Sequence, residues 1–181
     1  MKIVVLRPGD IAVALQLATS AGDTLAKTAK AVGRSIGEVH NAIIRLTAAR
    51  LADPDTRLIY RDPLLRFIEW GVPHAFPATI GGPAVGVPTS WDAVPGGVNA
   101  AETDDGQATR IRYVWPSAGG AARGLALYPL YPITPAIVDA NRPLWAALAL
   151  VDAVRTGGAR EAGAAARALA ALLPNLPPVP R

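Results

Sequence analysis

The sequence contains no cysteine, and its 181 residues include only two histidines, His40 and His74. The lack of cysteine excludes a disulfide scaffold, a thiol nucleophile and a thiolate metal site. The longest uninterrupted apolar run, Leu144–Val151, has eight residues, far below the roughly 20 that span a bilayer. The apolar run within Met1–Asp10 is too short for a signal peptide. We therefore expect a cytoplasmic protein with no membrane partner and no bound metal or cofactor.

Motifs of catalysis are also missing. The sequence has no GxxxxGK[ST] phosphate loop, no HExxH metal motif and no GxSxG nucleophile elbow. Asp104 and Asp105 form a pair of carboxylates, but their neighbours are typical of an exposed loop. We therefore expect a protein that is not an enzyme.

Positive charge is concentrated in one stretch. The whole chain has 18 Lys and Arg against 14 Asp and Glu, a net charge of +4. Between Thr24 and Arg61 there are seven basic and three acidic residues, so this stretch alone carries +4. A local basic excess is the electrostatic footprint of nucleic-acid binding. The ordinary alternative is a solvated helical face.

Residues 1–70 have the pattern of short helices. Pro8 and Asp10 are typical of a helix start, and a second helix is predicted over residues 24–32, ending at Gly33. Ser35 and Glu38 form a capping-box pattern at the start of a third helix. Residues 52–59 contain Pro54 between two aspartates, which predicts a turn and a short two-stranded wing. A further helix is predicted over residues 61–70.

The composition changes after residue 70. Residues 72–98 are rich in proline and glycine, which predicts neither helix nor regular sheet. Residues 107–131 are expected to form an antiparallel hairpin, and helices are predicted over 135–155 and 160–173. The four tryptophans are expected in the core, and helix 135–155 is the candidate dimer seam. On the 110–115 strand, Arg110 and Arg112 share one face, with Arg123 across the turn.

These patterns predict an α+β fold with two parts. Residues 1–70 form the first domain and residues 71–181 a small C-terminal domain for dimerisation, effector binding or partner binding.

The most informative motif is Leu25–Ile43. Two helices that cross through a tight turn need a small residue at their close approach, a turn glycine, and apolar contacts on the second helix. Ala29, Gly33, Val39 and Ile43 supply these. With its continuation LTAARLADPDTRLIYR, the stretch resembles the DNA-binding domain of bacterial winged helix-turn-helix transcriptional regulators of the MarR type. The resemblance covers about residues 6–70.

The resemblance implies that helix 35–50 lies in the major groove of double-stranded DNA. Asn41 would read a base, Arg45 would reach a phosphate or a guanine, and Arg57 would approach the minor groove. Ser35 and the helix start would suit a phosphate oxygen. The complete set of predicted DNA-binding residues is Lys27, Lys30, Arg34, Ser35, Ile36, Gly37, His40, Asn41, Ile44, Arg45 and Arg57.

Two functions remain open at this point. The first is a homodimeric DNA-binding regulator that represses transcription by occupying a promoter. The second is an antitoxin-like or adaptor protein that neutralises or recruits a partner protein. Gly37 and Ile44 offer no side-chain hydrogen bond on the reading face, and an outward Ile44 suits the second function.

Overall fold

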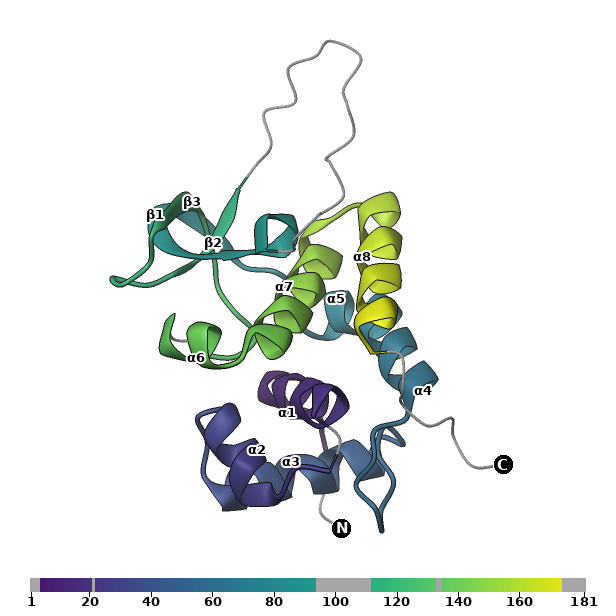
Figure 1. Cartoon of the computed structure of the whole chain (residues 1–181). Helices are drawn as coiled ribbons and strands as arrows, with labels where there is room; N and C mark the ends of the chain where they lie inside the picture. The colour runs from purple at the N-terminus through teal and green to yellow at the C-terminus, as the bar shows by residue number, and fades with distance from the viewer. Residues whose placement is uncertain (1–3, 21, 94–111, 133–134, 174–181) are drawn as a thin grey trace.

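The computed structural model describes residues 4–20, 22–93, 112–132 and 135–173 of the chain. It has the α+β class expected from the sequence (Figure 1). The helices are α1 (Pro8–Thr19), α2 (Leu25–Ala31), α3 (Ile36–Ala48), α4 (Arg61–Arg66), α5 (Val72–Ala75), α6 (Pro135–Ala140), α7 (Arg142–Thr156) and α8 (Ala159–Leu172). The strands are β1 (Ile80–Thr89), β2 (Tyr113–Pro116) and β3 (Ala122–Leu127). None of the helices in these ranges is both long and apolar enough to cross a membrane.

The first three helices begin where local sequence signals place them. α1 has its proline in the first turn, as predicted. At the start of α3, the Ser35 hydroxyl accepts a hydrogen bond from the Glu38 amide (3.2 Å), and the Glu38 carboxylate accepts one from the Ser35 amide (3.0 Å). The predicted capping box is therefore confirmed. Gly33 has a φ of 61°, the left-handed conformation that a glycine adopts without strain.

The helix that follows the wing region is longer than predicted. α4 continues into a π-helical turn, η1 (Phe67–Gly71), and then into α5. Gly71 permits this path, because a Cβ there would lie 2.6 Å from the Phe67 ring. The prediction that residues 72–98 avoid helix is therefore wrong at its start. The proposed domain boundary at residue 70 falls within this continuous helical path.

The same proline- and glycine-rich segment also contains the longest strand, so the prediction of no regular sheet is wrong as well. β1 spans ten residues and includes Pro83 and Pro88. It pairs antiparallel with β2 through its second half and with β3 through its first half. Residues 94–98 of the predicted segment lie outside the described residues.

β2 and β3 do not form the predicted hairpin. Both run antiparallel to β1 and pair parallel with each other, closing a small three-stranded barrel. The reason lies at Gly86, which pairs with Pro116 at the end of β2 and with Ala122 at the start of β3. The loop between them therefore crosses over β1 instead of reversing the chain. A Cβ on Gly86 would collide with the Trp115 carbonyl. Residues 107–111 lie outside the described residues.

The helix predicted over residues 135–155 is broken. α6 ends at Ala140, and Asn141 caps α7 by accepting a hydrogen bond from the Leu144 amide (3.3 Å). Pro143 then occupies the first turn of α7, where its missing N–H is tolerated. The predicted helix over 160–173 is confirmed as α8.

α7 is the central helix of the molecule. Figure 1 shows it between the α1–α3 group and the sheet, with α8 beside it. Its buried residues are Leu144, Ala147, Leu148, Ala149, Leu150, Val151, Asp152, Ala153 and Val154. This apolar face is covered within one chain, so it does not form the dimer seam predicted for helix 135–155.

The tryptophans do not all lie in the core. Trp115 is buried, whereas Trp70 is 70% exposed and Trp91 and Trp145 are partly buried. The buried face of the α4–α5 stretch is made by Leu64, Ile68 and Val72, at four-residue spacing. Trp70 falls on the opposite face.

A buried carboxylate attaches α7 to the sheet. Asp152 accepts hydrogen bonds from the Thr89 hydroxyl of β1 (2.8 Å) and the Trp115 indole of β2 (2.6 Å). Arg155 pairs with it at 2.6 Å and also donates to the Phe76 and Pro77 carbonyls. Burial raises the pKa of Asp152, and the Arg155 cation and the two donors oppose that rise.

We expect Asp152→Ala to lower the free energy of unfolding by about 3–5 kcal/mol, because it leaves a buried arginine without its anion. Urea unfolding followed by tryptophan fluorescence measures the change. Asp139→Ala, at an exposed position on α6, is the matched control, with an expected change of about 0.5 kcal/mol or less. Equal stability of the two variants would contradict this role of Asp152.

Candidate nucleic-acid interface

α3 has a buried face and an open face. Val39, Ile43 and Leu46 are buried against the rest of the molecule, as the spacing predicted, and Ala42 is buried with them. The residues predicted to read DNA from this helix are exposed: Ser35, Ile36, Gly37, His40, Asn41 and Ile44. In Figure 1, α3 lies at the end of the molecule opposite the sheet. The open face is therefore not covered by any segment within the described ranges.

Large apolar side chains lie on this open face. Ile36 is 52% exposed and Ile44 is 48% exposed. They bracket His40 and Asn41, the polar side chains of the same face. The face can therefore make both hydrogen bonds and apolar contacts.

Basic residues flank α3 on two sides. Lys27 and Lys30 are exposed on α2, and Arg57 is exposed in the 52–59 segment. Arg50, which follows the C-cap residue of α3, is also exposed. Sequence reasoning counted Arg50 in the basic excess but did not select it for the site. The position of Arg50 between the predicted helix and the predicted turn was the signal that could have identified it as a site residue.

The 52–59 segment forms a minimal hairpin, in which Ala52 and Ile59 make one antiparallel bridge. Asp53 organises its turn. One carboxylate oxygen accepts hydrogen bonds from the Thr56 amide (2.7 Å) and hydroxyl (2.8 Å), and the other accepts one from the Tyr60 hydroxyl (2.9 Å). The bonds from Thr56, with that from Tyr60, lower the pKa of Asp53 to about 2.

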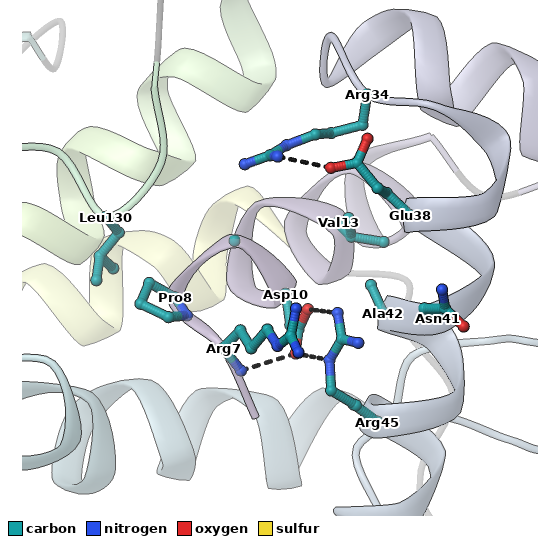
Figure 2. Close-up of a pocket in the computed structure, with 11 residues that line it drawn as sticks. Arg7, Pro8, Asp10, Val13, Arg34, Glu38, Asn41, Ala42, Arg45 and Leu130 are labelled. Atoms are coloured by element: carbon teal, nitrogen blue, oxygen red, sulfur yellow. Dashed lines mark hydrogen bonds and ion pairs between the residues drawn. The ribbon is translucent and has the colours of Figure 1, made fainter. Parts of the chain in front are cut away.

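Arg45 is bound to Asp10, at the start of α1. Its Nε and Nη2 donate to the two carboxylate oxygens, both at 2.7 Å (Figure 2). The Asp10 side chain is 2% exposed and the Arg45 side chain 17%. This bidentate pair attaches α1 to α3. The phosphate or guanine contact predicted for Arg45 would have to use its remaining amino group or break the pair.

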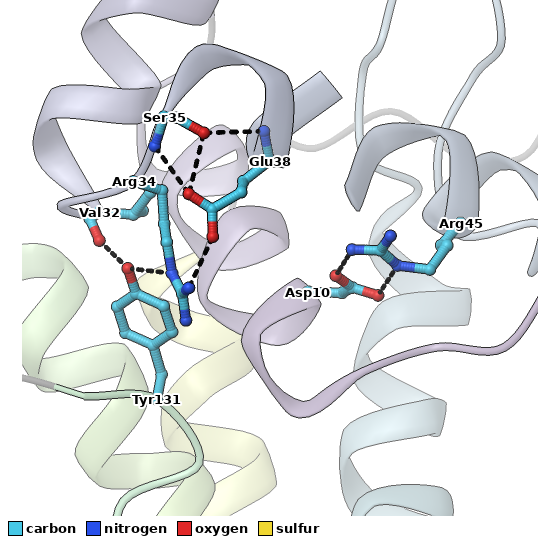
Figure 3. Close-up of polar contacts among 7 residues, drawn as sticks. All are labelled: Asp10, Val32, Arg34, Ser35, Glu38, Arg45 and Tyr131. Carbon is cyan, nitrogen blue, oxygen red and sulfur yellow. Dashed lines mark hydrogen bonds and ion pairs between the residues drawn. The ribbon is translucent and has the colours of Figure 1, made fainter. Parts of the chain in front are cut away.

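Arg34 is also engaged within the chain. It pairs with Glu38 at 2.7 Å, and its guanidinium lies 4.7 Å from the centre of the Tyr131 ring (Figure 3). Its Nε donates to the Tyr131 hydroxyl (3.0 Å), which in turn donates to the Val32 carbonyl in the α2–α3 turn. Sequence reasoning missed Tyr131, which lies 97 residues from Arg34.

Ser35 is occupied by its own helix cap. Its hydroxyl donates to the Glu38 carboxylate (2.9 Å) as well as accepting from the Glu38 amide. The hydrogen bonds from the Ser35 amide and hydroxyl, with that from Arg34, lower the pKa of Glu38. Glu38 therefore holds a negative charge at the start of α3, which disfavours the phosphate contact predicted for Ser35.

A second basic surface lies on the sheet. Arg112 and Arg123 line one groove of about 620 Å³, together with Val85 and Leu125. Arg112 and Arg123 therefore lie near each other, but not across the turn of the predicted hairpin, which does not form. Arg110 lies outside the described residues. Across the parts of the chain that the structure describes, no group of three or more acidic or histidine side chains is placed to hold a metal ion.

The Asp53 carboxylate should give the hairpin an acid-dependent stability. The folded pKa near 2 lies below the usual value of about 3.9 in an unfolded chain. The contribution is therefore complete above about pH 4 and is lost as the pH falls toward about 2.

We expect the stability difference between wild type and Asp53→Asn to narrow over that range, as measured by thermal melting. The carboxyl resonance of Asp53 should titrate with a midpoint near 2, and Thr56→Val should raise it. A midpoint near 4, the usual value, in the wild type would rule out this arrangement of donors.

Comparisons of the chain with models of protein families, with curated proteins and with solved structures found no match.

Proposed function

We propose that this protein is a sequence-specific DNA-binding regulator of transcription, and that α2 and α3 form its helix-turn-helix. The observation that carries the proposal is the open face of α3, which places Asn41 among exposed side chains while the opposite face is buried. A helix exposed along one side fits the major groove. The hairpin over 52–59 would act as a short wing.

The charge around α3 supports this proposal. Lys27, Lys30, Arg50 and Arg57 are exposed, and none has an ion-pair partner in the described ranges. These cations can contact the phosphate backbone and set the register of the helix. Asn41 can pair bidentately with adenine, and Ile36 and Ile44 can contact thymine methyl groups.

We further propose that the protein acts as a homodimeric repressor. Two copies related by a two-fold axis would present two α3 helices to half-sites about one helical turn of DNA apart. Occupying a promoter in this way would block transcription.

The test is an anisotropy titration at ~150 mM salt, comparing DNA from upstream of the gene that encodes this chain with a scrambled duplex. We expect the upstream DNA to bind roughly 10³-fold more tightly. The logarithm of affinity should fall with the logarithm of salt with a slope of about −3 to −4 for each copy, because four basic residues are available for phosphates.

Two substitutions distinguish direct reading of bases from general electrostatic attraction to the phosphate backbone. Asn41→Ala should relax the preference at one base pair by about tenfold. Lys30→Ala should instead weaken binding to every DNA sequence by the same factor. Arg160→Ala removes the same charge from an exposed position on α8. It is expected to change neither the base preference nor the general affinity for DNA. If Asn41→Ala and Lys30→Ala have equal effects on every sequence, direct reading by α3 is excluded.

One observation favours a second function. Ile36 and Ile44 are about half exposed on the same face, and an apolar pair of this kind suits a protein partner, as in an antitoxin-like or adaptor protein. If DNA binding is weak and equal for both duplexes, this function becomes the better one.

For the second function, co-expression with the product of an adjacent gene should give a stable complex in size-exclusion chromatography. The double substitution Ile36→Ser and Ile44→Ser should disrupt that complex, because it removes the apolar contact area. Val85→Ser, at a 43% exposed position on the sheet, is the matched control and should leave the complex intact. A complex that survives the double substitution would place the partner elsewhere.

A further inference from the structure

A cleft opens between the start of α1 and α3. Its volume is about 330 Å³, and Figure 2 shows the arginines that enter it from separate elements. Arg7 directly precedes α1, Arg34 lies in the α2–α3 turn, and Arg45 lies in the last turn of α3. The cleft is also lined by Gly9, Asp10, Val13, Glu38, Asn41 and Leu130.

Both acidic groups in this cleft are already engaged by donors of the chain. Asp10 accepts two hydrogen bonds from Arg45 and one from the Arg7 backbone amide (2.8 Å). Glu38 accepts from Arg34 through one oxygen and from the amide and hydroxyl of Ser35 through the other. Each carboxylate is therefore neutralised by an arginine and has most of its acceptor positions in use, which disfavours a cationic ligand.

The basic groups, in contrast, have donors left over. In the described ranges, Arg34 uses Nε and Nη1, and Arg45 uses Nε and Nη2. The second amino group of each therefore remains, together with the whole Arg7 guanidinium, which makes no side-chain hydrogen bond within those ranges. A guanidinium presents five N–H donors and accepts none. The cleft thus has a surplus of donors and a surplus of positive charge, three arginines against two carboxylates.

We propose that this cleft binds a small molecule through a phosphate group. Arginine binds phosphate through short, charge-assisted hydrogen bonds. A phosphate group offers three outer oxygens in a tetrahedral arrangement, so it can accept from guanidinium groups that approach from different directions. A planar carboxylate offers two oxygens in one plane and matches three such arginines less well.

The remaining walls set the size of the ligand. Val13, Ala42 and Leu130 give the cleft an uncharged side that suits the organic part of a phosphate ester. Gly9 keeps the space open, because a Cβ there would lie 3.3 Å from the Tyr131 ring and 3.8 Å from Nη2 of Arg34. The volume lies at the lower end of the range for small-molecule sites. The cleft therefore suits a compact phosphate ester.

This proposal does not rest on DNA binding, because the probe is inorganic phosphate and no DNA is present. We would titrate the full chain with phosphate and separately with acetate at constant ionic strength, using calorimetry. Phosphate should bind more tightly than acetate. Backbone amide resonances of Gly9 and Asn41 should shift with phosphate, whereas that of Gly124 in the sheet groove should not.

Arg7→Gln tests the site with little risk to the fold, because the Arg7 side chain is exposed and makes no described hydrogen bond. We expect it to weaken phosphate binding about tenfold or more, the usual effect of losing a hydrogen bond to a charged group. Arg123→Gln removes the same charge from the sheet groove and should leave phosphate binding unchanged.

Three results would overturn the proposal. In the first, phosphate binds no better than acetate. In the second, Arg123→Gln weakens phosphate binding and Arg7→Gln does not, which would place the anion site in the sheet groove. In the third, Arg7→Gln weakens binding of duplex DNA but not of phosphate, which would make the cleft part of a DNA-binding surface.

Discussion

The buried carboxylate of Asp152 fixes the position of the central helix, α7, on the sheet. Asp152 lies on the buried face of α7, where a carboxylate without partners would be strongly destabilising. Its partners come from β1, from β2 and, through Arg155, from the carbonyls that precede β1. No sliding or rotation of α7 along the sheet keeps all of these contacts. Since α1 and α8 also pack on α7, the position of most other elements depends on this network.

The orientation of α3 depends on the C-terminal half through two polar links. Gln16 on α1 accepts a hydrogen bond from the Asn141 side chain (2.6 Å), at the start of α7, and the same α1 holds α3 through Asp10 and Arg45. Tyr131, which follows β3, bonds to the α2–α3 turn. The orientation of α3, the proposed recognition helix, is therefore fixed by contacts with segments that are distant in the sequence. A ligand in the cleft beside α3 would contact three of the residues in these links, Asp10, Arg34 and Arg45.

Local signals predicted the elements that are stabilised by near neighbours in the sequence. The Ser35–Glu38 cap and the turn at Gly33 define α2 and α3, and helical periodicity predicted which face of α3 is exposed. The sheet could not be predicted in this way, because β1 pairs with strands that begin more than 20 residues after it ends. Prolines in β1 argued against a strand, and only the crossing at Gly86 explains why β2 and β3 run parallel. The contacts of Arg34 with Tyr131 and of Arg45 with Asp10 were missed for the same reason, since both partners are distant in sequence.

The internal pairing of arginines changes what the basic excess means. Of the seven basic residues between Thr24 and Arg61, three are ion-paired: Arg34, Arg45 and Arg61. Arg61 also donates to carbonyls at the C-terminal end of α8. The charge that DNA would meet near α3 is therefore smaller than a count along the sequence suggests. If this face binds DNA as proposed, recognition would therefore combine neutral contacts from Asn41 and the exposed isoleucines with the phosphate contacts of the four cations that stay exposed near α3. The remaining N–H donors of Arg34 and Arg45 lie instead in the cleft beside Asp10. A single small phosphate group would accept hydrogen bonds from them more readily than the extended backbone of DNA would.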